Sequence, residues 1–407
     1  MKLPESGIPR DELFTRMREM KTRDADWRGG RTWSLVYPAT EDVDEVLREA
    51  NTLYMFENAL NPFRFPSLRK MEAEVVAMTA SLLNAGEDAG GSMSSGGTES
   101  ILLAVKTARD RGKEEKGIER PEMVIPHSAH PAFAKAAKYL GLEMKQAPLR
   151  DDLRADVAAA AKLITENTVL LVGSAPSYPH GVIDPIADLA ALAAERNISF
   201  HTDACVGGFL LPFLERLGYP VPPFDFRVPG VTTMSADVHK YGYCTKGASV
   251  IVHRQQATLQ YQMFMYDQWP GGMYGSAAMA GTRPAAPIAA AWAVMNYLGE
   301  AGYLRLQKLV METAQRLRRG IESTPPLKIW GNPDASLLAF GSDEIDVMAV
   351  GDVMDDRGWH LDRQQNPAAL HLMVTPNHAK IVDRFLGDLR EAVATHGKSR
   401  GVEARYS

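Results

Sequence analysis

Five short apolar runs alternate with helical segments between residues 66 and 285, and this alternation constrains the fold more than any other feature. The runs are MVIP from residue 123, TVLLVGS from 168, ISFHTDA from 198, VTTMSAD from 231 and ASVIVHR from 248. Before and between them, segments such as SILLAVKTARDRG at 100–112 place apolar residues at helical spacing. Short, β-branched strands separated by helices indicate a buried, mainly parallel sheet with helices on both faces. We therefore expect an α/β large domain over residues 66–285.

The flanking segments have a different character. Residues 1–65 contain two short helical stretches joined by a connection rich in Gly, Arg and Trp, which we interpret as an N-terminal arm. Residues 286–407 begin with a long helix to about residue 298 and continue as strand, helix, strand and helix, a pattern typical of a small α+β domain. A chain of 407 residues is too long for one compact core, so we expect domains that share a cleft.

Charge and cysteine content exclude several classes of function. The formal net charge is -5 and no basic block is present, which argues against nucleic acid as a partner. Cys205 and Cys244 are far apart and lack any paired metal-ligand spacing, so we expect no metal and no disulfide. No apolar run reaches the roughly 18 residues that a membrane span needs. The sequence thus favours a cytoplasmic protein without a signal peptide or transmembrane segment.

Three stretches fall where ligands bind in open α/β sheets, beyond the carboxyl ends of the strands. The first is SMSSGGTESILL, in which Gly97 and Thr98 open an amphipathic helix. Its first backbone N–H groups and its positive end would face an anion such as a phosphate. A Gly-Gly pair before a helix is also common as plain capping, so this stretch alone leaves both interpretations open.

The other two stretches supply a carboxylate and an amine. Asp203 lies near the end of the run ISFHTDA, where an ionised carboxylate needs a cationic or hydrogen-bonding partner. Lys240 lies in DVHKYG, just after another apolar run. A lysine is usually a solvated surface charge, and that interpretation is the alternative to a functional amine. The helix start at Gly97 and Thr98 can bind a phosphate, and we call it the phosphate cup. Together with a buried carboxylate and a reactive amine it matches pyridoxal phosphate, which has a phosphate, a ring nitrogen that can be protonated and an aldehyde.

Six ordered motifs together resemble the sphingosine-1-phosphate lyases, pyridoxal phosphate enzymes of fold type I that are related to the group II decarboxylases. The motifs are SGGTESI, PHSAHPAFAKAAKYLG, GSAPSYPHGVIDPI, HTDACVGGFLLPF, FDFRVPGVTTMSADVHKYGYCTKGAS and GGMYGSAAMAGTRP. The fold in general shares SGGTES and the His-Lys pair, whereas HGVIDPI, DACVGGFLLPF and HKYGYCTKG are typical of the lyases. The resemblance implies a mainly parallel sheet of the seven-stranded type, and a chain similar to the soluble bacterial members.

The resemblance also implies a role for each residue around the cofactor ring. Lys240 corresponds to the lysine that binds the cofactor aldehyde, and His130 to the histidine that stacks on the pyridine ring. Asp203 corresponds to the partner of the ring nitrogen. A negative carboxylate there keeps that nitrogen protonated and makes the ring a stronger electron sink.

Two pairs of residues and one histidine are assigned to the phosphate in the same way. Gly97 and Thr98 match the phosphate cup, and His239 matches a histidine that helps to hold it. Gly275 and Ser276 match a loop that the second subunit supplies to the phosphate. The resemblance therefore implies a homodimer with shared active sites.

Further residues are implied on the substrate side. Tyr178 corresponds to an active-site tyrosine and Lys246 to a second lysine that faces substrate. Together with Lys240, they are the candidates for proton transfer. Tyr37 and Lys246 are expected near the substrate phosphate. Asn61 stands where the family often has a histidine, and an amide there donates a hydrogen bond without adding charge.

The implied reaction is a retro-aldol cleavage of sphingosine 1-phosphate, or of its saturated analogue, to a long-chain aldehyde and phosphoethanolamine. Two alternatives stay open. A group II amino-acid decarboxylase would use the same lysine, and Arg363 in HLDRQQNP is a candidate to bind its substrate carboxylate. A catalytically silent paralogue would use the same scaffold for binding only.

Overall fold

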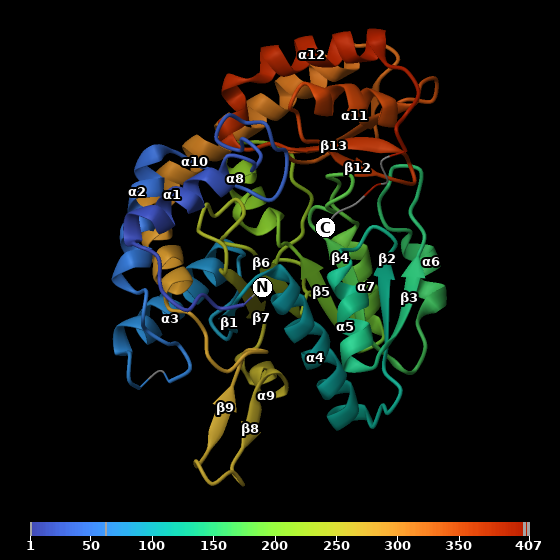
Figure 1. The fold of residues 1–407 in the computed structure, drawn as a ribbon. Helices are drawn as coiled ribbons and strands as arrows, with labels where there is room; N and C mark the ends of the chain where they lie inside the picture. Colours follow the sequence, from blue (N-terminus) through green and yellow to red (C-terminus); the bar gives the residue numbers. More distant parts are fainter. Residues whose placement is uncertain (1, 62, 402–403, 405–407) are drawn as a thin grey trace.

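A seven-stranded sheet forms the centre of the computed structural model, which describes residues 2–61, 63–401 and 404 (Figure 1). Its strands are β1 (Gly90–Ser94), β2 (Glu122–Pro126), β3 (Glu143–Ala147), β4 (Thr168–Ser174), β5 (Ser199–Asp203), β6 (Thr233–Ala236) and β7 (Ser249–His253). They are arranged in the order β1-β7-β6-β5-β4-β2-β3, in which β7 alone runs antiparallel to its neighbours. This confirms the mainly parallel α/β sheet.

Helices cover both faces of the sheet because its strands are apolar on both sides. In β4, Leu170 and Val172 pack in one hydrophobic cluster with α4 and α5, whereas Leu171 packs in another with α7. The helices of this part are α3 (Pro66–Leu82), α4 (Gly97–Lys116), α5 (Ala132–Leu140), α6 (Val157–Leu163), α7 (Ile186–Glu195), α8 (Leu211–Arg216) and α9 (Leu259–Gln262). The parallel strands therefore end together at one edge, between two helical layers.

A second, four-stranded antiparallel sheet lies beyond that edge among the residues that the structure describes. It runs in the order β10 (Lys328–Ile329), β11 (Leu337–Gly341), β13 (Ala369–Met373), β12 (Asp362–Gln364). Helices α11 (Val347–Asp356) and α12 (Val382–Thr395) pack on it. Helix α10 (Ala286–Glu322) joins the two parts and is broken at Gly299, whose φ of 52° is non-helical. The expected helix to about residue 298 thus ends at this break.

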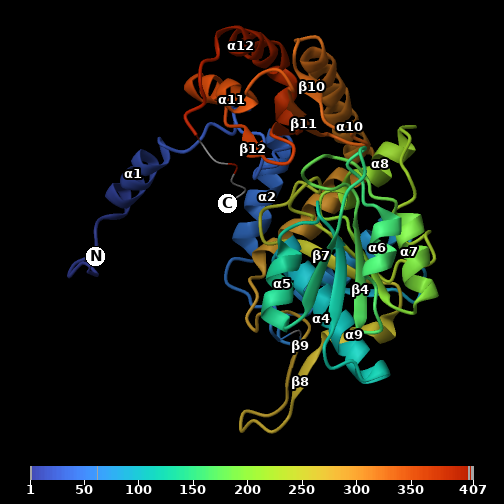
Figure 2. The same cartoon turned by 90° about the vertical axis from the view of Figure 1, so that its right-hand side faces the viewer.

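The N-terminal segment contacts both parts. Helix α2 (Glu41–Leu53) packs on α10, and Trp33 is buried in the core of the small sheet, stacked on His378 at 4.1 Å between ring centroids. Helix α1 (Arg10–Lys21) buries none of its residues and extends away from the body (Figure 2). No helix among the described residues is long and apolar enough to cross a membrane.

A two-stranded hairpin also projects from the body (Figures 1 and 2). It consists of β8 (Phe264–Tyr266) and β9 (Tyr274–Ser276). Its apolar side chains are exposed in the single chain, among them Phe264, Met265, Trp269 and Met273.

Candidate active site

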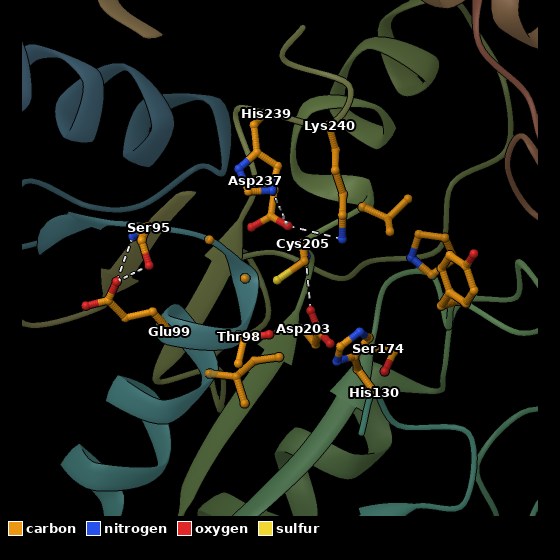
Figure 3. Close-up of a pocket in the computed structure, with 16 residues that line it drawn as sticks. Ser95, Thr98, Glu99, His130, Ser174, Asp203, Cys205, Asp237, His239 and Lys240 are labelled. Carbon is orange, nitrogen blue, oxygen red and sulfur yellow. Dashed lines mark hydrogen bonds and ion pairs between the residues drawn. The ribbon is translucent and has the colours of Figure 1, made fainter. Parts of the chain in front are cut away.

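A cavity of about 330 Å³ lies at the edge where the parallel strands end. Strands β4 and β5 end on Ser174 and Asp203, and β1 and β6 are followed directly by Ser95 and Asp237, so four strands place polar side chains on its wall. Figure 3 shows Asp203 and Asp237 facing the space between the first turn of α4 and Lys240, whereas Ser95 points toward Glu99. The volume falls within the roughly 300–1,000 Å³ of typical small-molecule and cofactor sites.

Lys240 and His239 converge on the buried carboxylate of Asp237 (Figure 3). The Lys240 ammonium lies 3.1 Å from Asp237 Oδ2, and His239 Nε2 lies 3.5 Å from the same oxygen. Burial by itself raises the pKa of Asp237. The charge of Lys240 and the hydrogen bond from His239 outweigh it and hold that pKa well below its usual range. The lysine amine therefore reaches the cavity with an ionised partner.

The first turn of α4 forms another wall of the cavity. Its first N–H groups have no partner within the helix, so they and the helix dipole favour an anion there. The helix begins at Gly97, and Thr98 follows it along the same wall. A Cβ on Gly97 would lie 2.7 Å from Cys205 Sγ and 2.8 Å from Asp237 Oδ2, so the absence of a side chain lets this turn approach the strand ends.

Asp203 and His130 line the cavity next to each other (Figure 3). Asp203 Oδ1 accepts hydrogen bonds from Cys205 N at 3.1 Å and from Ser235 Oγ at 3.3 Å. His130 Nδ1 accepts one from Ala132 N at 3.1 Å. Burial lowers the pKa of His130, although the Asp203 charge opposes this. A neutral imidazole, a suitable group to lie against an aromatic ring, thus stands beside a carboxylate.

These residues fit pyridoxal phosphate. An anion cup, a buried carboxylate and a lysine amine, the three groups expected from the sequence, line one cavity of suitable size. Within the described residues, Asp237 Oδ1 is buried without a hydrogen-bond partner. This wall of the cavity therefore holds an acceptor that is available to a ligand. The bare Gly97 keeps the cup open, as a phosphate would require.

Tyr178 also lines the cavity. Its hydroxyl donates a hydrogen bond of 2.7 Å to Asp362 Oδ2, which belongs to the small sheet. Its ring lies 4.7 Å from that of His371, centroid to centroid. The structure therefore places Tyr178 on the same cavity wall as Lys240, His130 and Asp203.

Lys246 and Tyr37 lie together, outside the cavity wall. The Lys246 ammonium donates to the His239 carbonyl at 3.0 Å and lies 4.5 Å from the centre of the Tyr37 ring. Surrounding protein atoms, and then the charge of Lys240, lower the pKa of Lys246 to about 8. The side chain nevertheless keeps an exposed surface, and its hydration limits this decrease. The buried Tyr37 donates its hydroxyl to Met373 Sδ.

Three further residues expected at the site do not line the cavity in the single chain. Asn61 is exposed, and its side-chain oxygen accepts from Phe63 N at 3.0 Å. Gly275 and Ser276 are in β9 of the projecting hairpin. For the latter two, this position is compatible with a contribution to another subunit.

Arg363 does not offer a free charge to a substrate carboxylate. Its guanidinium is buried and lies 2.9 Å from Asp352 Oδ1 and 2.5 Å from Asp355 Oδ2, and it donates to the Met348 carbonyl at 3.0 Å. Two carboxylates already neutralise it. The cation that the decarboxylase alternative needs is therefore engaged elsewhere.

Sequence reasoning missed several residues of the cavity wall. Asp237 is the most important, and its position three residues before Lys240, at the end of an apolar run, is a signal that would have found it. Cys205 and Ser174 are cavity residues without such a signal. Glu99 accepts from the backbone of Ser95 at 2.7 Å and thereby fixes the residue that precedes the cup.

Comparisons with known proteins agree with this geometry. Residues 30–342 match the family model described as the pyridoxal-dependent decarboxylase conserved domain. A sphingosine-1-phosphate lyase of Arabidopsis thaliana is 44% identical over 400 residues, which cover 97% of this chain and 73% of the relative. A rat sphingosine-1-phosphate lyase is 43% identical over 412 residues, which cover 99% of this chain and 72% of the relative.

Solved structures show the same likeness. The sphingosine-1-phosphate lyase of Burkholderia pseudomallei superimposes with a TM-score of 0.94 at 42% identity, covering 97% of this chain and 92% of that chain. A glutamate decarboxylase of Lactobacillus brevis superimposes with a TM-score of 0.86, over 99% of this chain and 96% of that chain, at only 20% identity. The second match shows a common fold and no more.

Proposed function

This chain belongs to the sphingosine-1-phosphate lyases, within the pyridoxal-dependent decarboxylase family, and from that premise we propose its substrate, its products and the roles of its residues. It cleaves the C2–C3 bond of sphingosine 1-phosphate, or of the saturated base, to a long-chain aldehyde and phosphoethanolamine. The observation that supports this most is the convergence of Lys240, Asp203 and His130 on one cavity.

Pyridoxal phosphate is the cofactor, and when bound it supplies the sink for the electron pair released from the C2–C3 bond. Lys240 would hold its aldehyde, and the first turn of α4, with Gly97 and Thr98, its phosphate. Asp203 would face its ring nitrogen, where a negative charge favours the protonated form. The His130 ring would lie against its face. His239 supports this arrangement through Asp237.

Two proton transfers complete the reaction. The C3 hydroxyl must lose a proton as C3 becomes the aldehyde carbon, and C2 must gain one. Tyr178 lines the cavity, and we assign the C3 proton to its hydroxyl oxygen, which passes its own proton to the Asp362 carboxylate as it accepts the new one. The Lys240 amine reaches the same cavity and is the donor that we assign to C2. Lys246 lies outside the wall, so we assign it to substrate binding.

The substrate phosphate needs cationic and hydroxyl donors. Lys246 supplies the charge, and Tyr37 holds the Lys246 ammonium through its ring. Asn61 lies away from the cavity in the single chain and would contribute an uncharged donor from the arm.

We also propose a homodimer in the cytoplasm. The hairpin that carries Gly275 and Ser276 exposes apolar side chains, including 56% of Trp269 and 70% of Met273, which a second copy would cover. Cys205 and Cys244 are free thiols, which suits a reducing compartment.

Product analysis tests the reaction. We expect the purified chain, supplied with pyridoxal phosphate, to release a long-chain aldehyde from phosphorylated sphingosine and sphinganine, and far less from the unphosphorylated bases. Each charge-assisted hydrogen bond to the phosphate contributes about 1.5–3 kcal/mol, so its loss is costly. Carbon dioxide from glutamate or an aromatic amino acid, with no aldehyde from either base, would assign the chain to the decarboxylases.

Light scattering under assay conditions tests the dimer. Dilution into monomers should release the cofactor together with activity, because Gly275 and Ser276 would then leave the partner's site. Replacing Trp269 and Met273 by Ser should have the same effect at higher protein concentration. Full activity in a demonstrated monomer would contradict the shared site.

A further inference from the structure

The carboxylate of Asp362 joins three segments that are far apart in the sequence. Its Oδ2 accepts a hydrogen bond of 2.7 Å from the Tyr178 hydroxyl, and its Oδ1 accepts one of 3.0 Å from Ser34 Oγ. Asp362 begins strand β12 of the small sheet, whereas Tyr178 follows strand β4 and Ser34 belongs to the N-terminal segment. One carboxylate thus links the small sheet to a residue of the cavity wall.

The ring of Tyr178 is held independently of its hydroxyl. His371 of strand β13 lies 4.7 Å away, centroid to centroid, and is fully buried. Burial lowers the pKa of His371 to about 4, so this ring is neutral near pH 7 and packs as an uncharged surface. With the ring fixed in place, the remaining freedom of Tyr178 is the direction of its O–H bond.

Tyr178 stands between two cavities. It lines the cavity that contains Lys240, and it also lines a neighbouring one of about 240 Å³ together with His130 and Asp362. A tyrosine hydroxyl has one proton to donate and lone pairs with which to accept. Because the one proton is donated to Asp362, the oxygen must act as the acceptor in a hydrogen bond with a substrate hydroxyl.

From this geometry we propose that Asp362 is a positioning residue, which directs the Tyr178 O–H bond away from the cavity and so leaves the phenolic oxygen as the acceptor for the substrate hydroxyl. The inference rests on the proposed function, in which that hydroxyl is the one on C3. Asp362 itself does not touch the reacting atoms. It acts through Tyr178 alone, and this makes the proposal testable by coupling.

A double-mutant cycle tests it, with the wild type, Asp362→Ala, Tyr178→Phe and the double variant loaded with pyridoxal phosphate. We expect Asp362→Ala to lower kcat about 10-fold, a difference of about 1.4 kcal/mol, with KM changed much less. In the Tyr178→Phe background the same change should have no further effect on kcat. An equal loss in both backgrounds, or no loss in the first, would overturn the proposal.

Two further variants separate positioning from simple structural support. Asp362→Asn keeps an oxygen that can accept from Tyr178, so it should recover part of the lost kcat. Ser34→Ala removes the other hydrogen bond of the same carboxylate and should leave kcat within about twofold. A loss as large for Ser34→Ala as for Asp362→Ala would mean that the carboxylate only anchors the small sheet.

Unfolding in urea provides a measurement that needs no activity. In the cofactor-free chain, the destabilisation of the double variant should be smaller than the sum of the two single ones, because both remove the same hydrogen bond. Strictly additive destabilisation would show that the Asp362 and Tyr178 side chains do not interact, and would overturn the proposal. A wild-type chain that releases no aldehyde would instead refute the proposed function, and this coupling would still decide whether Asp362 holds Tyr178.

Discussion

The ammonium of Lys240 lies 3.1 Å from the carboxylate of Asp237, a residue only three positions earlier in the chain. The Asp237 side chain is buried, and the Lys240 side chain is 15% exposed. Two charges that leave water together are tolerated only as a pair, since each alone would bear its full desolvation cost. Asp237 therefore keeps a charged lysine inside the cavity before any ligand arrives.

We predict that Asp237→Asn destabilises the cofactor-free chain by about 3–5 kcal/mol, because it removes the carboxylate that neutralises the Lys240 charge. Urea unfolding of the chain without cofactor measures this free energy. Asp151→Asn removes an exposed carboxylate and should leave the free energy of unfolding within about 0.5 kcal/mol. Equal stability of the two variants would show that the pair contributes little.

Lys240→Ala should abolish the visible absorption band of the bound cofactor. The Lys240 amine reaches the cavity, whereas the Lys246 ammonium lies against Tyr37 and the His239 carbonyl, outside the cavity wall. The matched variant Lys246→Ala should keep the band while losing turnover. Borohydride reduction followed by peptide mapping identifies the labelled lysine, and a label on Lys246 in the Lys240→Ala protein would show that the wrong amine was chosen.

Asp203→Asn should retain part of the bound cofactor and lose most of the turnover. An amide preserves the size of the side chain but cannot stabilise a protonated ring nitrogen by charge. Cofactor content from absorbance and aldehyde release from the same samples give the two quantities. Turnover equal to that of the wild type at equal loading would remove Asp203 from its proposed role.

The large sheet was predictable where strands are buried on both faces. The five apolar runs became β2, β4, β5, β6 and β7 because their sequences carry the signal of full burial. Strands β1 and β3 lie at the two edges of the sheet, and their sequences, GGSMS and EMKQA, lack the β-branched apolar residues of the central strands. An edge strand is defined mainly by the neighbour with which it pairs, so a local pattern does not reveal it.

The candidate site likewise has a part that the sequence predicts and a part that it does not. Lys240, Asp203 and Gly97 follow strands or open a helix, so their meeting at one edge followed from the topology. The Asp362–Tyr178 contact depends on how the small sheet packs over that edge, which no local spacing encodes. Gly275 and Ser276 lie in a hairpin that projects from the single chain, so any contribution to a site rests on the homodimer that we propose.

Gly97→Ala should weaken cofactor binding far more than it affects folding. The new Cβ would lie 2.7 Å from Cys205 Sγ, which is closer than van der Waals contact allows, so the first turn of α4 must shift. Gly387→Ala, in helix α12, meets no atom within 4 Å and should leave cofactor affinity unchanged. Titration of both variants with pyridoxal phosphate compares them, and wild-type affinity of Gly97→Ala would place the phosphate elsewhere.

Acid should destabilise the fold through buried histidines. Burial lowers the pKa to about 4 in each of His180, His201, His253, His371 and His378. In the unfolded chain these groups take up protons near pH 6.5, while the folded chain resists protonation down to about pH 4. Their stabilising contribution is therefore complete above about pH 6.5 and is lost as the pH falls from there towards 4.

The size of this effect can be measured residue by residue. Each histidine contributes up to about 1.4 kcal/mol per pH unit within that window, so unfolding free energies in urea at pH 7.5 and pH 5.5 should differ by several kcal/mol. His253→Gln, which keeps an amide donor for its partner Gln262, should reduce the difference by about 1 kcal/mol. The exposed His360→Gln should leave it unchanged. An equal difference in all three proteins would mean that His253 is already protonated in the folded chain, contrary to its burial.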